Sequence, residues 1–147
     1  MTLSHDHAAL KSLSLDYARA VDRRDSDLLL TLLSDDAQVI MPGVTMQGEE
    51  AFASITATLA SMFESTQHKV HNQTITINGN IASGETYCTA SHLRRRDDGK
   101  LEVEDWAIRY QDEYIKLNER WFFKVRELVI DWVEIRPAMA FGEQFEQ

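Results

Sequence analysis

Apolar residues in the first part of the chain recur at three- and four-residue intervals, which is the spacing of amphipathic helices. Asp25 precedes one of these runs, and an aspartate in that position caps the N-terminus of a helix. Gly48 and two glutamates precede another run, and acidic residues favour the first turn of a helix. A short apolar segment that ends at Pro42-Gly43 predicts a strand closed by a turn. The predicted elements are helices over residues 6–21, 26–33 and 48–63 and a strand over residues 37–41.

The second half of the chain has the pattern of long strands joined by short, turn-rich segments. Such short connections pair successive strands antiparallel as a meander. Because the helices precede the strands, the layout is α+β. The strands exceed the usual length of about 5–6 residues, so we expect the sheet to coil through bulges and to enclose a pocket under the helices. The predicted strands cover residues 68–77, 81–94, 101–116 and 121–135.

The size and composition of the chain fit one globular unit. With 147 residues, of which 44% are apolar, we expect a single domain over residues 1–147 that can surround an internal pocket. No apolar run approaches the roughly 20 residues of a membrane span, and residues 1–7 lack the pattern of a secretory signal. The one cysteine, Cys88, permits no internal disulfide. A cytoplasmic protein without a membrane partner is therefore expected.

Charge and motif content argue against several partners and cofactors. The net charge is −9, and the basic run Arg94-Arg95-Arg96 is followed directly by two aspartates, so no nucleic-acid surface is predicted. The sequence contains no glycine-rich phosphate loop and no CxxC motif. His68 and His71 stand three apart, so on a strand they face opposite ways and cannot join His92 around one metal ion. We expect neither a metal nor another cofactor.

The strand that begins near His68 holds the main candidate for chemistry. His68 and His71 face opposite sides of this strand. The face of His71 also carries Lys69 and Gln73, which predicts that it points outward, although two isoleucines follow on the same face. His68 is then the buried histidine and the candidate general base.

Four segments resemble the SnoaL-like branch of the nuclear transport factor 2-like superfamily, and the resemblance covers nearly the whole chain. They are residues 17–25 (YARAVDRRD), 66–68 (TQH), 79–82 (GNIA) and 110–114 (YQDEY). The resemblance implies a cone-shaped fold in which three N-terminal helices pack on a strongly curved, mainly antiparallel sheet around a pocket. Members of the superfamily include scytalone dehydratase, hexachlorocyclohexane dehydrochlorinase, ketosteroid isomerases and polyketide cyclases. Others have no known activity, so the fold alone does not decide function.

Four individual positions match those of scytalone dehydratase: Asp22, His68, His92 and Asn118. The match implies that Asp22 orients His68 as a base. It implies that the other two side chains bind the substrate and hold a carbonyl or leaving oxygen. The two water-holding tyrosines of that enzyme fall near Val21 and Met41 here, and neither of these side chains has a hydroxyl.

Two further members of the superfamily match the chain at fewer positions. Hexachlorocyclohexane dehydrochlorinase resembles the chain at Asp22 and His68, and its arginine has no assigned position here. Tyr17 is the candidate in the first helix for the tyrosine that ketosteroid isomerase chemistry needs. Tyr17, Val21 and Met41 are therefore candidate substrate contacts beside His92 and Asn118.

Each of these residues also has a plainer structural interpretation. An aspartate at the end of a helix, such as Asp22, is commonly a capping or turn residue. A lone histidine such as His68 is commonly a core residue whose nitrogens are satisfied by hydrogen bonds. His92 shares its strand face with small residues that leave room for a cavity, but it also adjoins the arginine run and could be exposed there.

Two functions remain open on these observations. One is a cofactor-independent lyase or isomerase that uses an Asp-His dyad on a small, largely apolar substrate, cyclic compounds included. The other is a non-catalytic module that binds a small molecule or supports a partner enzyme as a small subunit. Aromatic residues on a sheet that three short helices cannot cover predict a homodimer, and the resemblance to scytalone dehydratase implies a homotrimer. The tail over residues 137–147 either crosses the pocket mouth or joins a subunit contact.

Overall fold

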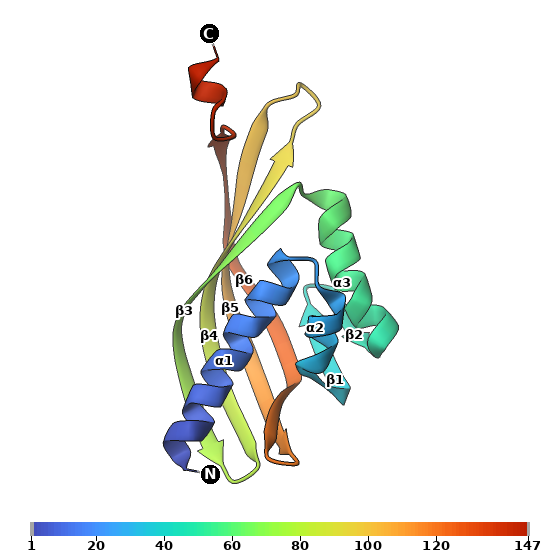
Figure 1. Ribbon diagram of the computed structural model, residues 1–147, viewed down its shortest axis with the longest axis vertical. Helices are drawn as coiled ribbons and strands as arrows, with labels where there is room; N and C mark the ends of the chain where they lie inside the picture. The colour runs from blue at the N-terminus through green and yellow to red at the C-terminus, as the bar shows by residue number, and fades with distance from the viewer. Residues whose placement is uncertain (1, 147) are drawn as a thin grey trace.

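Three α-helices pack against one strongly curved, six-stranded sheet in the computed structural model, which describes residues 2–146 (Figure 1). The helices are α1 (Leu3–Asp22), α2 (Ser26–Thr31) and α3 (Glu49–Met62). The strands are β1 (Leu33–Met41), β2 (Val44–Gln47), β3 (Ser65–Asn78), β4 (Ile81–Arg95), β5 (Leu101–Leu117) and β6 (Arg120–Ala138), and a short 3₁₀ turn, η1, covers Glu143–Phe145. The predicted α+β cone, with three helices on a mainly antiparallel sheet, is confirmed.

The sheet has the order β2-β1-β6-β5-β4-β3 and stays open, with β2 and β3 at its edges. Strands β3 to β6 form the predicted antiparallel meander. The prediction missed β2, and it did not foresee that β1 runs parallel to β6. It also continued the second helix to Leu33, whereas Leu33 already pairs with Phe123 of β6. The Phe123 N–H donates to the Leu32 carbonyl at 2.9 Å, so pairing with a distant strand overrides the helical spacing of the leucines.

A bulge in β3 decides which side chains point toward the helices. Val70 pairs with Cys88 and Gln73 pairs with Thr86, so β3 holds one extra residue in between. An extra residue reverses the alternation of faces beyond it. His71 is exposed, as expected, but the outward placement of Gln73 is wrong, because its amide donates to Ser14 on α1 at 3.0 Å. The reversal also explains why isoleucines follow on what had seemed to be a polar face.

Two bulges in β6 act in the same way. Tyr114 pairs with Phe123 and Glu113 pairs with Val125, which leaves Lys124 as an extra residue. A second shift of register leaves Asp131 as an extra residue farther along the strand. The first bulge turns Arg126 into the interior, where its side chain is 1% exposed.

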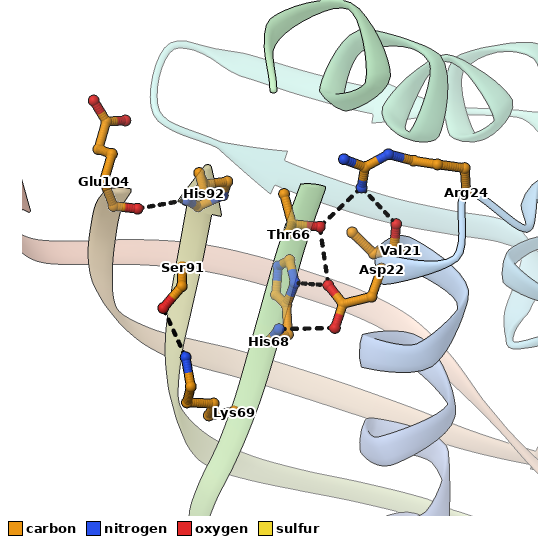
Figure 2. A network of polar contacts seen from close by, with 9 residues as sticks. All are labelled: Val21, Asp22, Arg24, Thr66, His68, Lys69, Ser91, His92 and Glu104. Atoms are coloured by element: carbon orange, nitrogen blue, oxygen red, sulfur yellow. Dashed lines mark hydrogen bonds and ion pairs between the residues drawn. The ribbon is translucent and has the colours of Figure 1, made fainter. Parts of the chain in front are cut away.

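Helix α1 is fixed on the sheet near its N-terminus, which sets the position of its other end. The Asp6 carboxylate is buried and accepts a hydrogen bond from the Trp121 indole at 2.8 Å, and it lies 3.0 Å from the Lys116 ammonium group. These two partners hold the pKa of Asp6 below its usual value. The apolar stripe of α1 is buried as predicted, with Leu10, Ala20 and Val21 almost inaccessible. Asp22, the last residue of the helix, therefore lies beside the beginning of β3 (Figure 2).

The far end of the sheet projects beyond the helices (Figure 1). There the β4–β5 hairpin and the last part of β6 extend together, and the tail continues in the direction of β6, away from the helices. Several apolar side chains of this end are exposed: Trp132, Val133, Ile135, Met139, Phe141 and Phe145. Of the two placements expected for the tail, the one across the pocket mouth of the same chain is not adopted by residues 137–146, which point away from the helices. Within residues 2–146, no helix is long and apolar enough to cross a membrane.

Candidate functional site

An internal cavity of about 290 Å³ lies between α1, α3, the β1–β2 hairpin and the sheet. Its wall is mainly apolar and includes Val21, Met41, Ile55, Leu59, Ile108 and Leu128. The wall also contains polar residues, namely Tyr17, Ser54, Thr58, His68, His92, Tyr110 and Arg126. A cavity of this kind, with a few convergent polar groups in an apolar wall, is the usual form of a small-molecule site.

Asp22 and His68 are in direct contact at one side of this cavity. The His68 Nδ1 atom lies 2.6 Å from Asp22 Oδ1, and the His68 backbone N–H donates to Oδ2 at 2.8 Å (Figure 2). The Thr66 hydroxyl donates to Oδ1 at 3.0 Å. Burial disfavours the charged carboxylate, but these hydrogen bonds outweigh it and hold the pKa of Asp22 below its usual value. An ionised carboxylate only accepts hydrogen bonds, so Nδ1 of His68 carries a proton, and in the neutral ring Nε2 has a free lone pair.

The backbone around Arg24 supports this contact. Arg24 has a positive φ of 56°, so the chain turns sharply after α1. Its Nη1 atom donates to the Val21 carbonyl and to the Thr66 hydroxyl, both at 2.8 Å. Because the Thr66 oxygen accepts from Arg24, its own proton is directed to Asp22. Thr66 and His68 are two residues apart on β3 and both point toward the end of α1 (Figure 2).

His92 lies on β4 next to His68, and the alternative in which it is exposed is excluded because it is only 1% accessible. Its ring packs against Phe63 and Trp106, with centroid distances of 4.6 and 4.1 Å. Its Nδ1 atom lies 3.0 Å from the backbone carbonyl oxygen of Glu104. Burial lowers the pKa of His92, so the neutral ring is favoured. A neutral ring that donates through Nδ1 cannot donate through Nε2, so this tautomer does not support the predicted role of His92 in holding a carbonyl oxygen.

The sequence interpretation missed Arg126, which enters the cavity from β6. Its guanidinium lies over the rings of Tyr110, Tyr17 and Phe123, at 3.6, 4.3 and 4.5 Å from their centroids. Nε is 3.1 Å from Asp112 Oδ1, but the two groups are not aligned for a hydrogen bond. Neither Nη1 nor Nη2 has a hydrogen-bond partner within residues 2–146. Arg126 is thus a buried cation with free donors, and such a group stabilises negative charge on a bound molecule.

A signal for Arg126 is present in the sequence, although strict alternation hides it. Alternation places Arg126 on the outer face with Lys124. However, the apolar residues Trp121 and Phe123 have odd numbers, whereas Leu128 and Ile130 have even numbers. This change of parity indicates a bulge between the two pairs, and a bulge there turns Arg126 inward.

The remaining predicted contacts divide into two groups. Tyr17, Val21 and Met41 line the cavity, the last two with apolar surface only. Asn118 does not reach it and lines a separate surface cleft with Leu33 and Phe122. Asn118 and the next residue both have positive φ, as the two-residue turn of the β5–β6 hairpin requires, and asparagine tolerates this conformation well. Its placement at the substrate is therefore corrected: it is a turn residue.

Among residues 2–146, no group of three histidine, cysteine, aspartate or glutamate side chains is arranged to hold a metal ion. The groups available for chemistry at the cavity are therefore the Asp22–His68 pair, His92 and the Arg126 guanidinium.

Comparisons with known proteins agree with this fold. The profile of the SnoaL-like domain matches residues 2–127. No curated protein sequence matches the chain. Among solved structures, the chain is similar to the Kfla4162 protein from Kribbella flavida, with 18% identity, a TM-score of 0.82, and coverage of 90% of this chain and 95% of that one.

Two other similar structures come from Novosphingobium species. A protein from N. aromaticivorans provisionally assigned as a scytalone dehydratase has 22% identity and a TM-score of 0.76, with 93% of each chain covered. The hexachlorocyclohexane dehydrochlorinase LinA-type3 from N. barchaimii has 17% identity and a TM-score of 0.77, with 93% of this chain and 92% of that one covered. At these identities, the similarity shows a shared fold.

Proposed function

Because the chain belongs to the SnoaL-like domain family, we propose that its cavity catalyses a cofactor-independent proton abstraction from a small, largely apolar substrate, which leads to elimination or isomerisation. The observation that carries the proposal is the 2.6 Å contact between Asp22 and His68, whose ring lines the cavity. Such a pair is the arrangement that general-base catalysis needs. Similar structures named as a dehydrochlorinase and, provisionally, a scytalone dehydratase support the reaction class.

In this mechanism, Nε2 of His68 removes a proton from a carbon of the substrate. The C–H bond breaks, an N–H bond forms, and the electron pair left on carbon forms a double bond. In an elimination, that pair expels a leaving group from the neighbouring carbon. In an isomerisation, the electron pair is delocalised onto a substrate oxygen, and His68 returns the proton to another carbon. Asp22 stabilises the imidazolium that forms in either case.

Arg126 supplies the opposite charge. Its guanidinium is buried beside an apolar cavity, where an electrostatic interaction is stronger than in water. We assign to Arg126 the stabilisation of the negative charge that develops in the reaction, on a departing anion or on an enolate oxygen. Val21 and Met41, near the positions of the two water-holding tyrosines, offer no hydroxyl to hold a water molecule against a substrate carbonyl, whereas Arg126 brings a positive charge to the cavity wall.

A non-catalytic binding module remains the second candidate, because the same apolar cavity and buried cation suit a ligand with one negative group. The two functions differ in what the Asp22–His68 pair contributes. In an enzyme the pair lowers a reaction barrier, whereas in a binding module it supplies one polar contact.

The test compares turnover and binding in three variants. Small halides, alcohols, enols and lactones are screened with the wild-type protein, and a converted compound is then followed with His68→Ala, Asp22→Asn and, as a control, His71→Ala on the exposed face of β3. We expect both site variants to lose roughly 10²- to 10⁴-fold in turnover while their ligand affinity changes little. The control should behave as wild type. Absence of conversion by the wild type, together with weaker ligand binding by the site variants, would contradict the enzyme and favour the binding module.

A further inference from the structure

His92 presents a hydrogen-bond acceptor to the cavity. Its Nδ1 atom lies 3.0 Å from the Glu104 carbonyl oxygen on β5, and a carbonyl oxygen can only accept (Figure 2). The proton therefore sits on Nδ1. The neutral ring has one proton, so Nε2 carries a lone pair. No hydrogen bond within residues 2–146 uses this Nε2 atom, and His92 is part of the cavity wall.

The surroundings of His92 keep the ring neutral. Phe63 and Trp106 both pack against the ring with apolar surface, in tilted orientations. The Glu104 carboxylate is already engaged, because it accepts from Trp106 Nε1 at 2.7 Å and from Arg94 at 3.2 Å. The other ionisable groups that act on the ring are His68 on β3 and Arg24 after α1, and both disfavour a second positive charge.

His68 and His92 offer the cavity two neighbouring hydrogen-bond acceptors when both rings are neutral. Their ring centroids are 6.0 Å apart, and the Nε2 atoms of both rings carry lone pairs. The proposed function uses the lone pair on Nε2 of His68 for proton abstraction. The second lone pair, on His92, has no hydrogen-bond partner within residues 2–146, and it becomes costly to leave unsatisfied when a molecule displaces water from the cavity.

We propose that the substrate of this cavity carries a hydroxyl, or another neutral hydrogen-bond donor, and that Nε2 of His92 accepts its hydrogen bond. The inference rests on the proposed function, since it names the substrate class of the same site. The separation of the two rings places this donor within a few bonds of the carbon that His68 deprotonates. Molecules of the same shape with a halide, ether or methyl group in that place leave His92 unsatisfied and bind less tightly.

A pair of probes of nearly equal shape tests the assignment. Dissociation constants of para-tert-butylphenol and para-tert-butyltoluene are measured by calorimetry for the wild type, for His92→Phe and, as a control, for His71→Phe. Phenylalanine keeps the aromatic stack of His92 and removes only the nitrogens. We expect the preference for the phenol over the toluene to fall roughly 10- to 100-fold in His92→Phe, and to be unchanged in the control. An equal preference in His92→Phe and wild type would overturn the inference.

A second measurement needs no probe and no variant. The ¹⁵N spectrum of the free wild-type protein at neutral pH reports which ring nitrogen of His92 is protonated. We expect a protonated Nδ1 and an unprotonated Nε2, and a protonated Nε2 would overturn the inference. Both experiments are independent of turnover. If the protein converts a substrate but His92→Phe keeps the wild-type preference for the phenol, the hydroxyl assignment is wrong and the proposed reaction still stands.

Discussion

The two histidines of the cavity differ in the group that Nδ1 contacts, and this difference determines how well each ring tolerates a positive charge. His68 faces the Asp22 carboxylate, which stabilises a positive charge on the ring. His92 faces a backbone carbonyl and is covered by two aromatic rings, so a positive charge on it is disfavoured. The pair thus combines one ring that is hydrogen-bonded to a carboxylate with one ring for which the neutral form is favoured.

The lowered pKa of His92 predicts how the stability of the protein changes with pH. Below about pH 6.5, the imidazole binds a proton in the unfolded chain more readily than in the folded protein. The free energy of unfolding therefore falls as the pH drops through this value, and the contribution of His92 is at most about 1.4 kcal/mol per pH unit. We expect His92→Phe to remove this contribution. Urea unfolding at pH 7.5 and 5.5 should then show a smaller difference in the free energy of unfolding for His92→Phe than for wild type. The exposed control His71→Phe should keep most of the wild-type difference.

At the scale of single residues, the sequence located one part of the site and not the other. Asp22 and His68 could be placed because each stands at the end of an element that is easily recognised, and the resemblance links them. The acceptor state of His92 could not be predicted, because it depends on a backbone carbonyl from another strand. Asn118 was misplaced because an asparagine suits a tight turn and a substrate contact equally well.

Strand pairing places the charge of Arg126 opposite that of Asp112. The two residues are direct partners in the β5–β6 register, and the side chains are 1% and 0% exposed. The Asp112 carboxylate also accepts a hydrogen bond from the Tyr114 hydroxyl at 3.0 Å. Burial raises the pKa of Asp112, so its charge depends on a nearby cation.

We therefore expect Arg126→Met to destabilise the protein by about 3–5 kcal/mol, because it leaves a buried carboxylate without a counterion. The double variant Arg126→Met/Asp112→Asn should recover most of this loss, since both charges are then absent. Urea unfolding of the wild type, both single variants and the double variant measures the coupling. Additive losses in the double variant would show that the two charges do not stabilise each other.

The elements themselves were predictable where one local rule was sufficient. Helical spacing gave α1 and α3, and short connections gave the β3–β6 meander. The missed features depend on distant partners: β1 begins where it meets β6, and each bulge depends on packing across strands. The bulge at Lys124 therefore also concealed Arg126.

The projecting end of the sheet carries the largest exposed apolar side chains of the molecule. Phe141 is 96% exposed, Phe145 is 75% exposed and Trp132 is 62% exposed. Several large apolar side chains exposed at one end of a molecule suggest an interface. A second copy of the chain is the partner that we propose, in line with the homodimer or homotrimer expected from the sequence.

This proposal predicts a complex larger than a monomer at micromolar concentration. Glutamate at both Trp132 and Ile135 should dissociate it, because two charges would then be buried in an apolar contact. Leu3→Glu is the matched control, since Leu3 is equally exposed at the opposite end of the molecule. Sedimentation velocity distinguishes the states. A monomeric wild type, or a complex that resists both charges, would exclude this surface as the contact.

The anchoring of α1 through Asp6 also determines when the site can form during synthesis. Helix α1 is made first, but Lys116 and Trp121, which hold Asp6, come about 100 residues later, which is roughly 5–20 s of translation. Strand β1 waits equally long for its partner β6. Until β6 has left the ribosome, the apolar stripe of α1 has no complete sheet to cover, and Asp22 is not yet held beside His68. We therefore expect a nascent chain that ends before β6 to contain both residues of the dyad but neither the anchor of Asp6 nor the part of the cavity wall that β6 provides.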